Sequence, residues 1–173
     1  SGVSQKFSMN FCDIRYLSYL KSGCVAGSLS LKNASYVSVY GSILKHGSNV
    51  IENCSTVRID ASVIDASSYR YTGSHGYLES SVPITYSLTI KSPSSNISII
   101  NNCFNLDSTR GTQKGIHSGL ISFGGTSGTI NNVKIVNNNM VAKSNLIHNQ
   151  ALLNFSAPTG TVLSNIEYVN NLN

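Results

Sequence analysis

Short stretches of alternating apolar and polar residues recur along this chain. Each stretch begins at an aliphatic residue, which we call its opening: Val37, Val57, Ile97, Val133 and Ile166, with a weaker first copy at Ile14. Alternation with a period of two predicts β-strands that bury one face. The shortest interval separates Val37 from Val57, and the longest separates Val57 from Ile97. A minimum of roughly 20 residues, with the longer intervals filled by loop-like sequence, predicts a β-solenoid in which each stretch belongs to one turn.

Two late segments repeat most closely. The first contains residues 119–123, 128–130 and 132–138, and the second contains residues 151–155, 160–162 and 165–171. The offset from Phe123 to Phe155 is one residue shorter than the offset between the Asn pairs. The second segment is therefore expected to contain one inserted residue, and the match places Gly160 opposite Gly128.

A pair of small or polar residues follows five of the six openings at one constant distance. The pairs are Gly41-Ser42, Ala61-Ser62, Asn101-Asn102, Asn137-Asn138 and Asn170-Asn171. Asn tolerates the left-handed backbone of a sharp corner, and its amide can bond to the same amide one turn away. The equal spacing predicts a ladder of small amides and hydroxyls stacked at one corner.

Composition supports this interpretation. The chain has 173 residues, enough for one domain with a core. Only 11% of the residues are charged, against a usual value of about 25%. The polarity comes instead from 30 Ser and 20 Asn, which a stacked corner accommodates without charge repulsion. Few helix formers argue against an all-α fold, and the many aliphatic residues argue against disorder.

Several functional classes find no support in the sequence. No apolar run approaches the roughly 18 residues of a membrane span, so no membrane insertion is expected. Arg15, Lys32, Arg58, Lys91 and Lys134 stand singly, which disfavours nucleic acid as a partner. The four cysteines, at positions 12, 24, 54 and 103, form no CxxC pair, so we expect free thiols, no metal and no cofactor.

The repeat resembles the right-handed parallel β-helix of the pectate-lyase-like superfamily, and most of all bacteriophage tailspikes, whose coils often read N-x-I-x-I-x-N-N. Residues 95–102 read Ser-Asn-Ile-Ser-Ile-Ile-Asn-Asn. The resemblance extends from about Phe11 to the end of the chain. It implies an all-β, right-handed parallel β-helix of about six coils, forming a single domain over residues 1–173 that is a piece of a longer tailspike or tail fibre.

The same resemblance implies a function. A tailspike is carried on the virion, at the phage tail, and is exposed to the extracellular medium. The intact spike is expected to be a homotrimer that binds the bacterial cell-surface polysaccharide, either capsule or O-antigen, and that can depolymerise it. The alternatives are a non-catalytic receptor-binding or structural segment, and a secreted bacterial pectate-lyase-like enzyme or adhesin.

Chemistry is expected where the chain leaves the repeat, at residues 45–50, 65–82, 105–119 and 141–150. These excursions depart from equivalent points, so they should lie above one another on one flank. They contain all four histidines of the chain. Two interpretations stay open, because loops are polar in any protein: ordinary surface loops, or one groove lined by all four excursions.

Candidate site residues follow from polysaccharide chemistry. Glycoside hydrolysis uses two carboxyl groups, and the catalytic candidates are Asp60, Asp65, Glu79 and Asp107. Aromatic rings can stack on sugars, while Arg and His can meet hydroxyls or acidic groups. The substrate-binding candidates are Tyr69, Arg70, Tyr71, His75, Tyr77, Arg110 and His117. A lyase would use His117 or His75 as a base, and we favour a hydrolase over a lyase if the protein is an enzyme.

Overall fold

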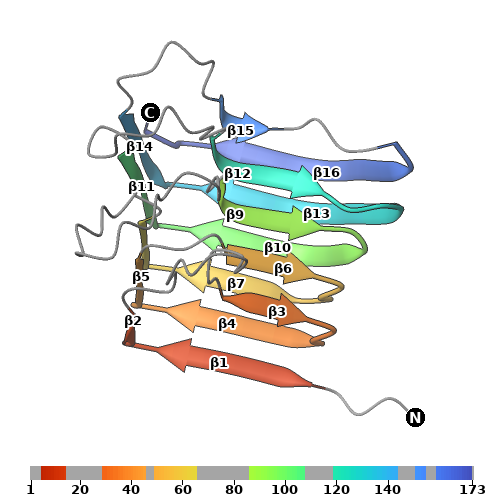
Figure 1. The fold of residues 1–173 in the computed structure, drawn as a ribbon, viewed down its shortest axis with the longest axis horizontal. Helices are drawn as coiled ribbons and strands as arrows, with labels where there is room; N and C mark the ends of the chain where they lie inside the picture. The colour runs from red at the N-terminus through yellow and green to blue at the C-terminus, as the bar shows by residue number, and fades with distance from the viewer. Residues whose placement is uncertain are drawn as a thin grey trace, which may run out of the picture.

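A computed structural model describes residues 5–14, 29–45, 49–65, 86–107, 119–143, 151–154 and 159–172. These residues form sixteen strands, and no helix occurs among them. The strands make three parallel sheets, and each sheet contains every third strand of the chain (Figure 1). The predicted all-β class is confirmed.

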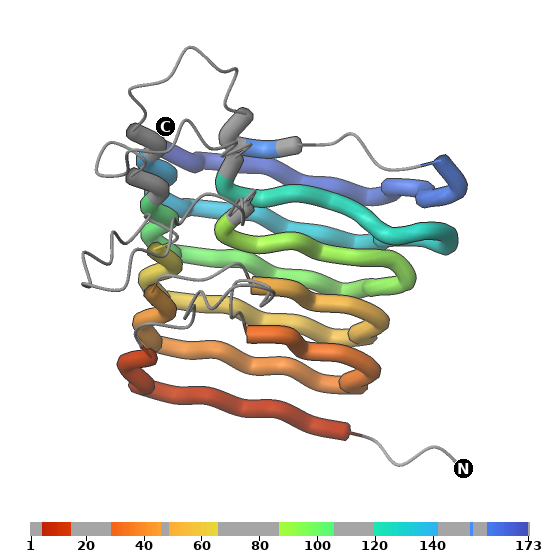
Figure 2. Tube along the Cα trace, viewed as in Figure 1, coloured from red at the N-terminus to blue at the C-terminus, as the bar shows by residue number. Residues whose placement is uncertain are grey.

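Sheet A has six strands: β1 (Lys6–Asn10), β4 (Tyr36–Tyr40), β7 (Val57–Asp60), β10 (Ser94–Ile100), β13 (Gly128–Val136) and β16 (Thr161–Val169). Sheet B has five: β2 (Asp13–Ile14), β5 (Ile43–Lys45), β8 (Val63–Asp65), β11 (Cys103–Asp107) and β14 (Asn139–Lys143). Sheet C has five: β3 (Ser30–Lys32), β6 (Asn49–Glu52), β9 (Tyr86–Lys91), β12 (Gly119–Gly124) and β15 (Ala151–Asn154). The chain visits A, B and C in turn and advances through the stack one unit at a time (Figure 2).

The predicted openings are aligned across sheet A. Val37 pairs with Val57, Val57 with Ile97, Ile97 with Val133, and Val133 with Ile166. The first four are at most 1% exposed, and Ile166 packs against the same core from the last strand. Five of the six openings are therefore confirmed. The repeat is visible in the sequence because each unit buries the same aliphatic position against its neighbours.

The prediction that Ile14 is the first opening was wrong. Ile14 lies in sheet B, where it pairs with Leu44, and the residue aligned with Val37 is Phe7 in β1. Phe7 and Met9 both pack on the core, so β1 carries the alternation one corner earlier than expected. The first interval therefore runs from Phe7 to Val37 and is longer than the interval that follows it.

The position of the late insertion also differs from expectation. Gly128 pairs with Thr161 rather than with Gly160, so the inserted residue precedes β16. This alignment is explained by which side chains of β16 point toward the core and which point toward the solvent. Ile130 is fully buried and aligns with Leu163, which packs on the core, whereas Val162 is 59% exposed. A slip of one residue would exchange these two faces.

The core lies between the three sheets and is almost entirely aliphatic, with Phe104 and Phe123 as its largest buried rings. Three cysteines are free, as predicted: Cys54 is buried, and Cys12 and Cys103 are half-buried. Cys24 lies outside the described residues.

Candidate functional site

The corner between sheets A and B has the predicted left-handed backbone. The first residue of each pair has a φ between 50° and 57°: Gly41, Ala61, Asn101, Asn137 and Asn170. The same conformation occurs at Phe11, one unit earlier, where φ is 53°. We call this turn the closed corner, because the residue that follows each of these positions faces inward.

The second residue of each pair forms the predicted ladder. The Asn138 side-chain Oδ1 accepts hydrogen bonds from the backbone N of Asn102 at 2.9 Å and from its Nδ2 at 3.0 Å. Asn138 donates in turn from its backbone N and Nδ2 to Asn171 Oδ1, both at 2.9 Å. Serines continue the ladder, since Ser62 donates its backbone N to Asn102 Oδ1 at 3.0 Å. Asn102 and Asn138 are at most 2% exposed, so this ladder is structural.

A second series of left-handed residues lies either at the corner where the chain enters sheet A from sheet C or just inside the sheet A strand that follows it. These residues are Asn33, Asn53, Asn96, Asn132 and Asn165, with φ between 51° and 58°. We call this turn the open corner, because all five residues are exposed. Their side-chain amides form hydrogen bonds between neighbouring units: Asn53 Nδ2 donates to Asn33 Oδ1, and Asn132 Nδ2 donates to Asn96 Oδ1, both at 2.8 Å.

Sequence reasoning missed the open corner, although a signal was present. An Asn precedes each opening by four residues at Val37 and Val57, and by one residue at the three later openings. Because the number of residues between the Asn and the opening changes from four to one, these Asn residues do not form a regular sequence repeat. In the two early units the Asn lies in a turn outside the strands, whereas in the later units it lies inside a longer sheet A strand.

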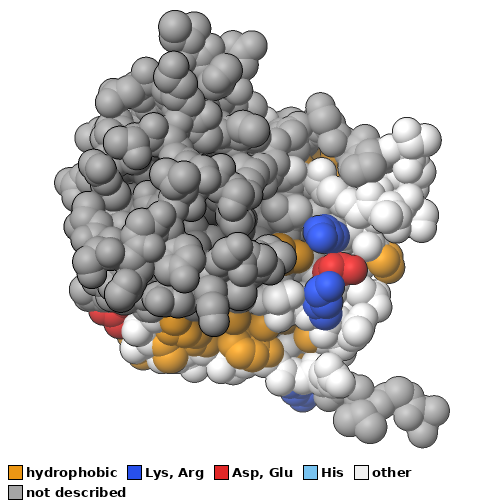
Figure 3. Space-filling view, viewed as in Figure 1, with side chains coloured by type: hydrophobic (Ala, Val, Ile, Leu, Met, Phe, Trp, Pro, Cys, Tyr) orange, Lys and Arg blue, Asp and Glu red, His pale blue; other side chains and the backbone are white. Residues whose placement is uncertain are grey.

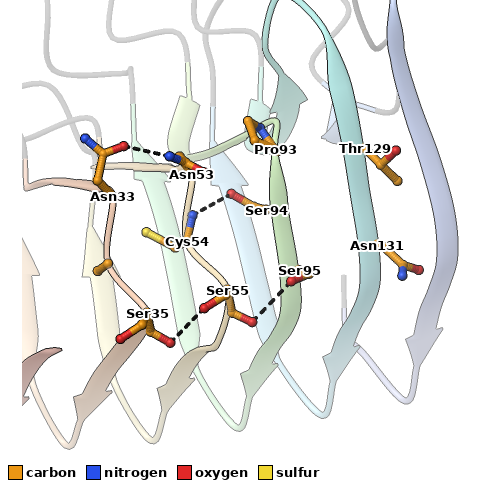
Figure 4. A pocket seen from close by; sticks show the side chains of 11 residues that line it. Asn33, Ser35, Asn53, Cys54, Ser55, Pro93, Ser94, Ser95, Thr129 and Asn131 are labelled. Atoms are coloured by element: carbon orange, nitrogen blue, oxygen red, sulfur yellow. Dashed lines mark hydrogen bonds between the residues drawn. The ribbon is translucent and has the colours of Figure 1, made fainter. Parts of the chain in front are cut away.

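A groove of about 620 Å³ runs along the open corner across several units (Figure 4). Its lining comprises Asn33, Ala34, Ser35, Asn53, Cys54, Ser55, Pro93, Ser94, Ser95, Thr129 and Asn131. The serines form a second ladder, because Ser55 Oγ donates to the Ser35 carbonyl at 2.9 Å and Ser95 Oγ to the Ser55 carbonyl at 3.2 Å.

The groove lining is polar and uncharged. Apart from the Cys54 thiol, the polar side chains that line it carry amides and hydroxyls, with no carboxylate, imidazole or amine among the described residues. Such groups donate and accept hydrogen bonds at fixed positions, and they provide no general acid or base. The groove is therefore suited to binding a neutral, hydroxyl-rich ligand rather than to cleaving one.

Asp60, a predicted catalytic residue, is bound by the side chains of Arg58 and Asn101. It ends β7, its side chain is 8% exposed, and its Oδ2 is 2.6 Å from Arg58 Nη2. Its Oδ1 accepts a hydrogen bond from Asn101 Nδ2 at 3.3 Å. The hydrogen bond to Asp60 and the charge of that carboxylate raise the pKa of Arg58, so the guanidinium stays charged.

The other predicted carboxylates are not gathered around Asp60 by the described structure. Asp65 ends β8 in sheet B, where it pairs with Lys45 and Asn105, while Asp60 lies in sheet A. The backbone of Asp107 ends β11 and pairs with Lys143. Glu79 lies outside the described residues, and so do all the substrate-binding candidates: Tyr69, Arg70, Tyr71, His75, Tyr77, Arg110 and His117.

The excursions all leave the stack from the ends of sheet B strands, but the last two begin two residues later than predicted, because β11 continues to Asp107 and β14 to Lys143. The undescribed stretches 46–48, 66–85, 108–118 and 144–150 each connect a strand of sheet B to a strand of sheet C. Where the first excursions begin, Lys45 is aligned with Asp65 on the neighbouring strand, and Asp65 is aligned with Asn105 on the next strand. The four histidines all lie in these stretches, outside the described residues.

Charges on the outer face of sheet C form a row that the sequence did not suggest. Lys32, Glu52 and Lys91 are aligned on three neighbouring strands. Glu52 Oε2 is 3.0 Å from Lys32 Nζ and 3.9 Å from Lys91 Nζ. Figure 3 shows two basic groups on either side of an acidic one on the visible face. Two lysines that stand singly in the sequence thus share one carboxylate.

The described residues were also compared with the requirements of a metal site and of a membrane span. No three His, Cys, Asp or Glu side chains in these ranges are grouped so that they could hold a metal ion. The same ranges contain no helix of the length and apolarity needed to cross a membrane. A scan against protein-family models and searches of curated proteins and of solved structures found no match to this chain. The repeat, the three sheets and the groove are therefore the features of this chain that bear on its function.

Proposed function

We propose that the three-sheet stack is a right-handed parallel β-helix of about six coils. Three features support this proposal: the strict A, B, C order of the strands, the constant position of the openings, and the ladder at the closed corner. A parallel crossover between strands of one sheet is right-handed in about 98% of cases, which favours this hand.

We further propose that the β-helix binds the surface polysaccharide of a bacterial host, as a segment of a phage tailspike. The observation that carries this proposal is the uncharged groove at the open corner, to which each of four successive units contributes a hydroxyl group and three of them contribute an amide. Parallel strands lie about 4.8 Å apart, so these groups recur at short, regular intervals. A polysaccharide presents hydroxyl groups in the same repetitive way.

The wider setting follows from the resemblance of the repeat to tailspikes. In this proposal the protein is carried on the phage tail, exposed to the extracellular medium, and the intact spike is a homotrimer. Its partner is a capsular or O-antigen polysaccharide, with neither nucleic acid nor a membrane involved.

A binding segment without catalysis is the second candidate, and one observation favours it. Both oxygens of Asp60 already accept bonds from Arg58 and Asn101, so this carboxylate is committed to the fold. Depolymerisation would then depend on Asp65, Asp107 and Glu79 together with the excursions. Hydrolysis needs two carboxyl groups about 5–10 Å apart across the scissile bond.

The test uses purified capsular and O-antigen polysaccharides from a panel of bacteria. Binding is measured by affinity electrophoresis, and cleavage by sizing the fragments and assaying new reducing ends. The polysaccharide-binding proposal predicts retardation by at least one member of the panel. Fragments with new reducing ends would support hydrolysis, unsaturated ends would support a lyase, and retardation without fragments would support binding alone.

The groove is tested in the same assay with the double variant Asn33→Gly, Asn53→Gly. Glycine keeps the left-handed backbone and removes both amides, so binding should weaken about tenfold, as two hydrogen-bonding groups are lost. Asn137→Gly is the matched control, because it makes the same change at the closed corner, outside the groove. Unchanged binding by the double variant would contradict the groove as the binding site.

A further inference from the structure

The outer face of sheet A carries a second group of side chains suited to a ligand. Tyr36, Ser38 and Tyr40 alternate along β4 with the buried Val37 and Val39, so all three point outward. Tyr36 and Tyr40 are 39% and 42% exposed. Two large aromatic side chains thus stand on the same face of one strand.

Arg58 lies between these two rings on the neighbouring strand. It is aligned with Ser38, so both tyrosines are its diagonal neighbours across the pair of strands. Its side chain is 59% exposed, and the electrostatic influence of Tyr36 and of Tyr40 contributes to its raised pKa after the larger effect of Asp60. The arginine and the two tyrosines therefore form one cluster.

Neighbouring residues hold parts of this cluster in place. The ring of Phe11 meets Tyr40 edge to face, with ring centroids 5.4 Å apart and an interplanar angle of 83°. Gly41 provides the space for this contact, since a Cβ there would lie 2.8 Å from the Phe11 ring. Asp60 binds Arg58 through Nε at 3.3 Å and Nη2 at 2.6 Å. Both bonds use Nε and Nη2, so among the described residues the N–H groups of Nη1 can donate to a ligand.

We propose that Tyr36, Tyr40 and Arg58 form a saccharide-binding platform on the outer face of sheet A, distinct from the groove. Aromatic faces stack on the C–H faces of sugars, and a planar guanidinium donates to ring hydroxyls. The tyrosines are four residues apart on one strand, or about 13 Å, so the ligand is an oligosaccharide rather than a single sugar. The platform rests on the proposed function, because it assigns a second contact surface to the same polysaccharide.

The chemistry of this face favours a sugar over another protein chain. The central outward row is polar in every unit: Ser8, Ser38, Arg58, Ser98, Lys134 and Glu167. Lys and Glu are depleted at protein interfaces, whereas this row contains both Lys134 and Glu167. Asp60 neutralises Arg58 and Glu167 pairs with Lys134 at 3.4 Å, so the row presents hydrogen-bonding groups with little net charge.

The experiment compares Tyr36→Ala and Tyr40→Ala with Tyr36→Phe and Tyr40→Phe. The probe is the panel polysaccharide that the unaltered protein binds most tightly, and the readout is its dissociation constant. Loss of a ring should weaken binding at least about fivefold, while loss of the hydroxyl alone should change it by less than about twofold. Circular dichroism and thermal melting establish that each variant is folded.

Fluorescence gives a second readout that needs no ring deletion. The chain has nine tyrosines and no tryptophan, so tyrosine dominates its emission. Addition of the polysaccharide should change this emission, and Tyr36→Phe with Tyr40→Phe should remove most of the change.

The outcomes separate this proposal from the proposed function. If the unaltered protein binds a polysaccharide, the Asn33 and Asn53 variants weaken it and the Ala variants bind normally, the platform is overturned and the groove stands. If no member of the panel binds, both proposals fall. If the Ala variants instead convert an oligomer to a monomer by light scattering, the face is a contact between copies of this chain, and the platform is overturned.

Discussion

The two corners of the stack use the same residue in opposite ways. At the closed corner Asn138 is 1% exposed, and its amide oxygen and nitrogen both bond to neighbouring units. At the open corner Asn53 is exposed, and its side-chain Nδ2 donates to Asn33. One amide is fully committed to the fold, whereas the other remains accessible to a ligand.

The difference depends on one position in each turn. At the closed corner the left-handed residue comes first, and the residue after it turns inward and carries the ladder. At the open corner the left-handed Asn itself carries the amide and faces the solvent. A buried amide without partners is costly, so the inward ladder must be complete, while the outward amides can exchange a water molecule for a sugar hydroxyl.

Removing a member of the inward ladder should have the largest effect on stability. Asn138→Ala removes the acceptor Oδ1 that both the buried backbone N and the side-chain Nδ2 of Asn102 use. We expect a loss of about 3 kcal/mol in the free energy of unfolding, measured by urea denaturation. Asn137→Gly, next to it but exposed, should change the value by less than about 0.5 kcal/mol. An equal loss in both variants would break the distinction between the two positions.

Gly41→Ala should have the next largest effect, at the left-handed position of the closed corner. A Cβ there meets the Phe11 ring at 2.8 Å, and φ is 56°. We expect a loss of about 1–2 kcal/mol, measured in the same way. In a Phe11→Ala background the steric part disappears and only the backbone strain remains. A cost that is no smaller in that background would show that the ring contributes nothing.

Ala61→Gly should produce a smaller change of opposite sign. Ala61 has a φ of 50° at the equivalent position of the next unit, a conformation that glycine adopts without strain. We expect a gain of about 0.5 kcal/mol, or a rise of roughly 1–2 °C in melting temperature by calorimetry. A fall in melting temperature would indicate that the methyl group contributes packing that outweighs the strain.

The open corner should show the smallest effect on stability. Asn33→Gly with Asn53→Gly removes one exposed amide pair and keeps the left-handed backbone, so the free energy of unfolding of the double variant should change by less than about 0.5 kcal/mol. The same variant is the one expected to weaken polysaccharide binding. A large loss of stability here would mean that both corners are structural.

Much of the repeat could be predicted from the sequence. The openings at Val37, Val57, Ile97, Val133 and Ile166 were found because each unit buries an aliphatic residue at the same position, and local alternation records that burial. The Asn pairs were found because a tight turn at a fixed distance needs the same small residues each time. These features depend on residues that are neighbours along the chain.

Only the tertiary structure decided how strands far apart in sequence are aligned. In the structure the first opening is Phe7 rather than Ile14, and the late insertion precedes Thr161. The structure also shows the open corner with its groove. It also set Arg58 beside Ser38, between two tyrosines on the strand of the preceding unit. Register between parallel strands follows from hydrogen bonding and from the packing of inward side chains across units. The sequence therefore determined which residues repeat, and the stacking determined which of them meet.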